Sequence, residues 1–224
     1  MPLQAITSAE PIPGYRIRER IGAGGYGEVW TADAPGGLVK AIKFVYGFLN
    51  EDRATRELKA LNRIKSVRHP FLVSLERIEV VDGQLLIVTE LAEASLKERF
   101  EECRASGLPG IPRDELMRYM RDTADVLDFM NEEHSLQHLD IKPENLLFTS
   151  DRGQLKVGDF GIARVLSGGR TMATAAGDVL GTPAYMAPEQ ATGSAVTPAT
   201  DVYALGVTVY EMLSGSLPFP PADS

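Results

Sequence analysis

The chain has 224 residues, of which 44% are hydrophobic and 24% are charged, a balance that argues against a disordered protein and suits one domain or two small lobes. Its formal net charge of −8 argues against a nucleic acid or an anionic membrane as a partner. The single cysteine, Cys103, excludes an intramolecular disulfide and a cysteine-rich metal site.

Residues 1–14 contain three prolines and little periodicity, so we expect them to form a loose leader. They lack the basic and apolar regions of a secretory signal. Nowhere does an apolar run approach eighteen residues, so the sequence predicts no membrane segment. We therefore expect a cytoplasmic protein.

From Tyr15 to Phe44 the pattern predicts strands around a glycine-rich turn. Residues 15–21 alternate apolar and charged side chains and lead into Gly-Ala-Gly-Gly-Tyr-Gly-Glu-Val at 22–29. Such glycines let the backbone approach a phosphate closely, and alone they could equally open a dinucleotide-binding unit. That alternative needs a helix next, whereas residues 28–33 continue as a strand. A glycine-rich hairpin fits better, followed by a strand at 38–44.

The remaining elements follow from periodicity and from turn residues. Apolar residues at helical spacing predict helices at 52–65 and 114–133, and apolar runs predict strands at 72–80 and 84–90. Thr197 and Pro198 form a helix start, with threonine as the cap and proline at the first position. Residues 202–210 carry no charge, so we expect that helix to be buried on most faces.

Two signatures of phosphate chemistry lie between His138 and Gly161. The first is Asp-Ile-Lys-Pro-Glu-Asn at 140–145, and the second is Asp-Phe-Gly at 159–161. The apolar runs at 146–148 and 155–157 flank a turn, which predicts a hairpin between the two signatures. Such a hairpin can bring two acidic groups towards one ligand, as phosphoryl transfer requires.

In order and spacing, these motifs resemble those of protein kinases, and more narrowly eukaryotic-like Ser/Thr kinases of the bacterial type. The resemblance runs from about Tyr15 to Phe219, and residues 181–189 resemble the substrate-docking segment with its Ala-Pro-Glu close. It implies an α+β fold with two lobes and ATP between them. Residues 15–90 would form a lobe with an antiparallel sheet and one helix, and residues 91–224 a mainly helical lobe that looks truncated.

The resemblance also implies roles for individual residues. Asp140 would accept or orient the substrate hydroxyl, and Lys142 would stabilise charge on the transferring phosphoryl group. Asn145 and Asp159 would hold Mg²⁺. Lys43 would pair with the α- and β-phosphates of ATP, with Glu57 as its ion-pair partner and Glu51 as the less favoured alternative. The residues expected to contact the nucleotide are Ile21, Gly22, Gly24, Gly27, Val29, Ala41, Lys43, Thr89, Glu90, Ala92, Leu147 and Asp159.

Three functions remain open from the sequence. The first is an ATP-dependent kinase that phosphorylates Ser or Thr of protein substrates, and the second is a nucleotide-binding but inactive scaffold. The third is a small-molecule phosphotransferase of the related fold. The glycine-rich hairpin and the docking segment disfavour the third.

The sequence departs from the family pattern in two places. Leu139 stands where most regulated kinases have an arginine that anchors a phosphorylated loop. The sequence stops at Ser224, so we expect Glu189 to lack its usual arginine partner and the apolar residues of 202–213 to be incompletely covered. We therefore expect a fragment or a partner-dependent chain with weak or absent kinase activity, which associates with itself or another protein through this surface.

Overall fold

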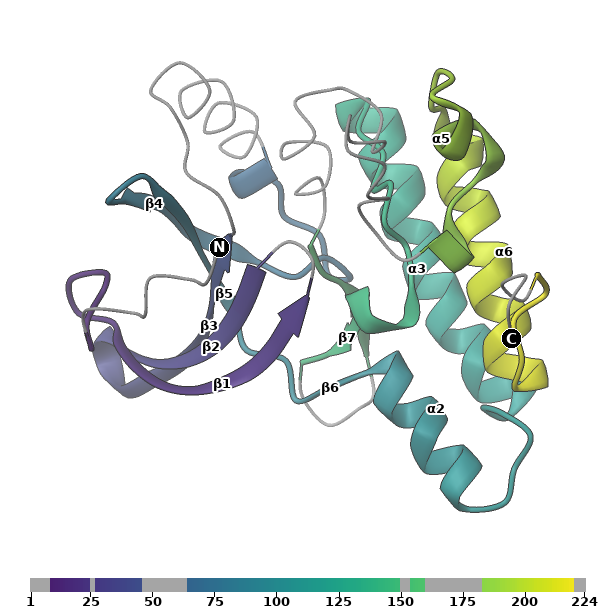
Figure 1. Ribbon diagram of the computed structural model, residues 1–224, viewed down its shortest axis with the longest axis horizontal. Helices are drawn as coiled ribbons and strands as arrows, with labels where there is room; N and C mark the ends of the chain where they lie inside the picture. The colour runs from purple at the N-terminus through teal and green to yellow at the C-terminus, as the bar shows by residue number, and fades with distance from the viewer. Residues whose placement is uncertain (1–8, 25–26, 46–63, 150–153, 160–182, 220–224) are drawn as a thin grey trace. The chain divides into compact units, whose positions relative to one another are not determined.

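The computed structural model describes residues 9–24, 27–45, 64–149, 154–159 and 183–219 (Figure 1). The chain divides into two compact units. Unit 1 comprises Met1–Val67 with Ser74–Leu91, and unit 2 comprises Arg68–Val73 with Ala92–Ser224. The first is built on an antiparallel sheet and the second mainly on helices, which confirms the α+β class expected from the sequence.

Unit 1 contains a five-stranded antiparallel sheet in the order β1-β2-β3-β5-β4. Its strands are β1 Arg16–Gly24, β2 Gly27–Ala34, β3 Leu38–Val45, β4 Leu75–Val81 and β5 Gln84–Glu90. The first hairpin closes where Gly24 pairs with Gly27. A Cβ at position 27 would lie 2.1 Å from the carbonyl oxygen of Phe44, so only glycine lets β2 and β3 pair this closely. The helix expected at 52–65 lies outside the described residues as far as residue 63.

The alternation of side chains along β3 gives this sheet two distinct faces. Ile42 and Phe44 point to one face, where they join a fully apolar cluster. Its buried members are Ile12, Ala32, Ile42, Phe44, Leu86 and Val88. Ala41 and Lys43 point to the opposite face, where Ile87, directly opposite Lys43 on β5, is also buried, so side chains are shielded on both faces of the sheet.

The expectation of a loose leader over 1–14 is wrong for residues 9–14. Ile12 is 0% exposed and belongs to the core of unit 1. The segment is also tied to β1, because Tyr15 N–H donates to Ile12 O at 2.9 Å and Ile17 N–H donates to Ala9 O at 2.9 Å. The core face of the sheet needs apolar cover, and one isoleucine between two prolines supplies part of it. A single buried residue leaves no periodic signal in the sequence.

Unit 2 combines helices with a small three-stranded sheet in the order β6-β7-β8. Its described elements are β6 Ala94–Ser95, α2 Leu96–Ala105, α3 Arg113–His134, β7 Leu146–Phe148, β8 Leu155–Val157, α5 Pro188–Thr192 and α6 Pro198–Ser214, with the short 3-10 turns Pro143–Asn145 and Pro183–Tyr185. Helices α3 and α6 lie side by side (Figure 1). The helix expected at 114–133 and the hairpin of β7 and β8 are both confirmed.

The segment 68–73 belongs to unit 2 although it lies between two elements of unit 1 in the chain. Val73 N–H donates to Val157 O at 3.0 Å, and Val157 N–H donates to Phe71 O at 2.8 Å. The ring of His69 stacks on Phe129 of α3, with centroids 4.8 Å apart. These bonds to β8 explain why β4 begins at Leu75, three residues later than the sequence predicted.

Helix α6 corrects the expectation that residues 202–210 are buried on most faces. Ala204, Val207 and Met212 are buried, but Val202 is 65% exposed and Tyr210 is 49% exposed. The exposed apolar face expected for this region is therefore present among the described residues. Association through this face stays a prediction. No described helix is both long enough and apolar enough to cross a membrane.

A charged cluster joins α2 to α3. Arg99 donates to Glu115 through Nε at 2.7 Å and through Nη2 at 3.1 Å. Tyr119 Oη–H donates to the same carboxylate at 3.1 Å. The Arg99 guanidinium is the main cause that lowers the pKa of Glu115, and both side chains are mostly shielded from solvent. This two-point contact ties α2 to α3.

The burial of Ile12 makes a prediction for stability. Ile12→Ala should lower the unfolding free energy of unit 1 by about 2–5 kcal/mol, because it removes a fully buried side chain and leaves a cavity. Urea unfolding followed by the fluorescence of Trp30, which packs against this core, measures the loss. Leu38→Ala is the matched control, since Leu38 is 55% exposed. Equal midpoints for the two variants would contradict the placement of Ile12.

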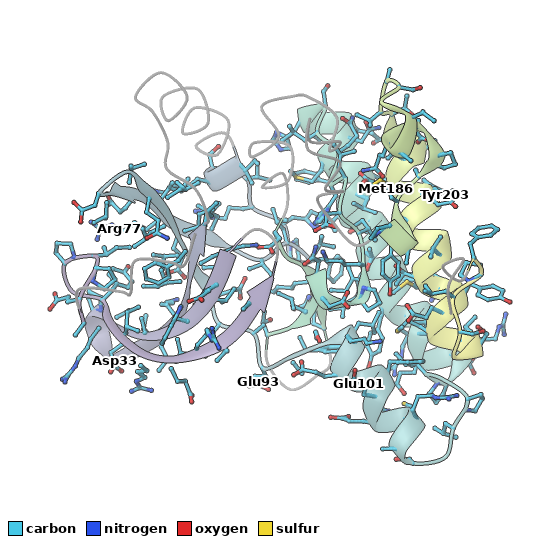
Figure 2. The ribbon with its side chains drawn as sticks, in the orientation of Figure 1. Asp33, Arg77, Glu93, Glu101, Met186 and Tyr203 are labelled. Carbon is cyan, nitrogen blue, oxygen red and sulfur yellow. The ribbon has the colours of Figure 1, made fainter. Side chains whose placement is uncertain are left out.

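The Arg99–Glu115 contact predicts a pH dependence of stability. Because the folded-state pKa of Glu115 is lowered, its contribution is complete above the unfolded-state value of about 4.3 and is lost as the pH falls through the lower folded value. Glu115→Gln should therefore melt below the parent protein at pH 7 and approach it at pH 3. Glu101→Gln, on the exposed side of α2 (Figure 2), should follow the parent at both values. A constant gap across this range would show that Glu115 acts through packing alone.

Candidate active site

Three of the predicted catalytic residues form one hydrogen-bonded group in unit 2. Lys142 Nζ lies 2.9 Å from Asp140 Oδ2 and 3.1 Å from Oδ1. Asn145 Nδ2 donates to the same Oδ2 at 3.0 Å and to the backbone carbonyl of Asp140 at 2.7 Å. The side chains of Asp140 and Lys142 are only 15% and 14% exposed. The loop thus holds a carboxylate with a cation on one side and an amide on the other.

The backbone just before this carboxylate adopts a strained conformation. Leu139 has φ +66°, in the left-handed region where a leucine side chain is crowded. Such a residue costs of order 1–3 kcal/mol and persists only where its surroundings fix it. Asp201 of α6 provides that support, since its Oδ2 accepts from His138 N–H and its Oδ1 from Leu139 N–H, both at 2.7 Å.

Asp201 is the functional residue that sequence reasoning missed. It is 5% exposed, and burial raises the pKa of its carboxyl group, while the two backbone N–H donors act in the opposite direction. The available signal was a lone carboxylate followed by nine uncharged helical residues. An acid beside an apolar helical stretch can be buried on the packed face of the helix, and a buried carboxylate requires donors from elsewhere.

His138 connects the two phosphate signatures. Its ring is 0% exposed, with Nδ1 accepting from Asp140 N–H at 3.2 Å and Nε2 lying 2.7 Å from Gly158 O. Because Nδ1 accepts, the proton sits on Nε2 and donates to Gly158 O. This buried position, bonded on both ring nitrogens, gives His138 a structural role. Asp159 follows directly and has φ +54°, a conformation that aspartate tolerates better than leucine.

Four of the predicted nucleotide-binding residues of unit 1 share one face of the sheet. Lys43 pairs with Val29 of β2, and Ala41 pairs with Thr89 of β5. Residues directly opposite each other in an antiparallel pair point to the same side, as do residues two apart in one strand. Val29, Ala41, Lys43 and Thr89 therefore lie together, opposite the core face. Gly22 pairs with Val29 and brings the glycine-rich turn to the same strands.

By resemblance to protein kinases, Glu90-Leu91-Ala92 would be the hinge segment that contacts adenine through its backbone, and it lies at the end of unit 1. The boundary between the units falls between Leu91 and Ala92. The carboxylate of Glu90 accepts from Ser74 N–H at 2.7 Å, and Glu90 N–H donates to Ser74 O at 3.3 Å. The side chain of Glu90 is thus bound to Ser74, the residue before β4. The contact of the Glu90 backbone carbonyl with adenine stays a prediction.

Three further expected site residues differ in how they are placed. Ile21 on β1 is 50% exposed, and Leu147 is the central residue of β7, close to Gly158. Glu57, the expected partner of Lys43, lies outside the described residues, as do Phe160, Gly161 and Thr182.

The segment that leads into α5 lies beside α6, as Met186 and Tyr203 mark in Figure 2. Tyr185 Oη–H donates to the buried carboxylate of Glu211 on α6, and burial together with this contact raises the pKa of Tyr185. Glu189, expected to lack its usual arginine partner, has a hydroxyl partner instead. Its Oε1 accepts from Thr200 Oγ1 at 2.6 Å, a bond that lowers the pKa of Glu189. The half-buried carboxylate therefore stays ionised.

The anchoring of the loop by Asp201 gives a testable expectation. Asp201→Asn keeps one acceptor but turns an amide donor towards a backbone N–H, so unit 2 should lose about 1.5–3 kcal/mol. Thermal melts followed by circular dichroism measure the loss. Asp128→Asn, the same substitution at an exposed position of α3, is the control. Identical melting of the two variants would show that Asp201 does not stabilise the loop.

Comparison with known proteins gives one consistent result. Residues 15–224 match the family described as protein kinase domain. The chain is 32% identical over 212 residues to the probable serine/threonine-protein kinase PknB of Lactococcus lactis, and 35% identical over 212 residues to the serine/threonine-protein kinase PrkC of Bacillus subtilis. It is 32% identical over 206 residues to the dual specificity mitogen-activated protein kinase kinase jkk-1 of Caenorhabditis elegans.

These alignments cover 92%, 92% and 91% of the chain, but it spans only 32%, 31% and 46% of the respective relatives. The match to the family nevertheless covers nearly the whole chain and includes both phosphate signatures. The chain therefore belongs to the protein kinase family.

Proposed function

We propose that the chain uses ATP and Mg²⁺ to transfer the γ-phosphoryl group to Ser or Thr hydroxyls of protein substrates. The observation that carries this proposal is the group formed by Asp140, Lys142 and Asn145, held on a loop whose backbone is bound by Asp201. Membership of the protein kinase family and the two relatives named as serine/threonine-protein kinases support the same activity.

In this proposal Asp140 orients the substrate hydroxyl and receives its proton. The hydroxyl oxygen forms a bond to the γ-phosphorus while the bond to the oxygen bridging the β- and γ-phosphorus breaks, and ADP leaves with that electron pair. Lys142, within 2.9 Å of Asp140, would face the oxygens of the transferring group and stabilise their charge. The transfer needs no covalent intermediate with the protein, so positioning and charge do most of the work.

The donor atoms of Asn145 and Asp159 fit Mg²⁺. The amide nitrogen of Asn145 is turned towards Asp140, which leaves the amide oxygen as the atom for a cation. An amide oxygen and a carboxylate are hard oxygen ligands of the kind that Mg²⁺ prefers. When bound, Mg²⁺ would neutralise charge on the phosphates of ATP.

The nucleotide would lie against the face of the sheet that carries Val29, Ala41, Lys43 and Thr89. Small and branched side chains there leave room for the flat adenine ring, and Lys43 supplies a cation for the phosphates. The pairing of Lys43 with Glu57 stays part of the proposal.

The proposal is tested first with the parent chain and Asp140→Asn. Transfer from labelled ATP to a generic Ser/Thr protein substrate should fall about a hundredfold or more in the variant, because the general base is lost. The affinity for ATP, measured by calorimetry, should change little, since Asp140 acts on the hydroxyl. Asp128→Asn controls for the loss of a charge.

Full turnover by Asp140→Asn would remove Asp140 from the catalytic role. In the same assay Asp159→Ala should abolish Mg²⁺-dependent transfer, and Lys43→Met should weaken productive ATP binding. A parent chain that binds ATP and transfers nothing would instead support the inactive scaffold.

A further inference from the structure

The side chain of Gln190, in the first turn of α5, links two backbone segments and has no role in the proposed mechanism. Its side chain is 7% exposed. Oε1 accepts from Ala187 N–H at 3.1 Å, and Nε2 donates to Leu139 O at 3.0 Å. The reverse orientation of the amide would place oxygen against a carbonyl and nitrogen against an N–H, so the chemistry of the two neighbours fixes the assignment.

The bond to Leu139 O acts on the peptide unit that leads into Asp140. That planar unit contains the carbonyl of Leu139 and the N–H of Asp140. Gln190 holds its oxygen, and His138 Nδ1 holds its N–H at 3.2 Å. Rotation of the unit would break both bonds and swing the Cα of Asp140, together with its carboxylate.

Three consecutive peptide units are therefore held by side chains. Asp201 binds the N–H groups of His138 and Leu139, which belong to the first two units, and Gln190 with His138 binds the third. The third unit is the one nearest the carboxylate. It also adjoins Leu139, whose positive φ is strained, so the backbone there would change conformation if these bonds were lost.

We propose that Gln190 is a positioning residue, which sets the orientation of Asp140 for phosphoryl transfer through the carbonyl of Leu139. The proposal rests on the proposed kinase activity. It also makes the segment that resembles the substrate-docking region part of the support of the catalytic loop, because Ala187 lies in that segment and shares the same glutamine.

A purely structural role for Gln190 would lie in its contact with Ala187 at the start of α5. Gln190→Glu separates the two roles. Glutamate keeps the length of the side chain and an oxygen that accepts from Ala187 N–H, but in its ionised form it has no hydrogen to donate to Leu139 O. Gln190→Met removes both bonds without adding charge. Thr192→Val is the control within α5, since Thr192 is exposed and its hydroxyl donates to Pro188 O.

The experiment measures steady-state transfer and backbone hydrogen exchange on the full chain. In Gln190→Glu, kcat should fall about tenfold or more, as expected when a catalytic group is misplaced, while KM for ATP stays within about twofold. Hydrogen exchange in peptides covering 138–145 should become faster, and exchange in α3 should not change. Thr192→Val should match the parent in every measurement.

A variant Gln190→Glu with parental kcat would overturn the proposal, whatever its exchange. A fall in kcat with parental exchange at 138–145 would also overturn it, because the effect would then arise elsewhere. If Gln190→Glu does not fold, by circular dichroism, Gln190→Met decides by the same criteria. If the parent chain transfers no phosphate, the proposed function fails, and exchange alone decides: faster exchange at 138–145 supports the link and parental exchange overturns it.

Discussion

The two hydrogen bonds from the backbone of His138 and Leu139 to the carboxylate of Asp201 are the contact on which the rest of unit 2 depends. They join the loop of Asp140 to a long helix that buries Thr200 and Asp201 in its first turn. They also offset the strain of a leucine in the left-handed region. Because a desolvated carboxylate needs donors and a strained backbone needs restraint, each side of the contact supplies what the other lacks.

From this contact the arrangement of the site extends in two directions. In one direction, the buried ring of His138 links the backbone N–H of Asp140 to the carbonyl of Gly158, the residue before Asp159. In the other direction, Gln190 links Leu139 to the first turn of α5. Thr200 of α6 binds Glu189 in that same turn. Asp140 and Asn145 are short side chains, and side chains bind the backbone of 138–140 at four polar groups, so the backbone itself keeps Asp140 in place.

In unit 1 the side chains are divided between the two faces of the sheet. Alternation along β3 gives Ile42 and Phe44 to the core and Ala41 and Lys43 to the opposite face. The core face is completed by Ile12 from the segment ahead of β1. That apolar cover allows the other face to carry a lysine and small side chains without loss of stability.

The sequence by itself determined the elements and the motifs, because both depend on neighbours in the chain. Period-two alternation, helical spacing and turn residues located β1 to β3, α3 and the hairpin of β7 and β8. The motif that contains Asp140, Lys142 and Asn145 predicted side chains that the structure brings together. Only the tertiary structure showed that Ile12 is buried, that residues 71–73 pair with β8, that Glu189 has a partner, and that Asp201 and Gln190 hold the loop. These depend on contacts between segments far apart in the chain: His138 and Asp201 are 63 residues apart, and no local pattern encodes which donor a buried carboxylate will meet.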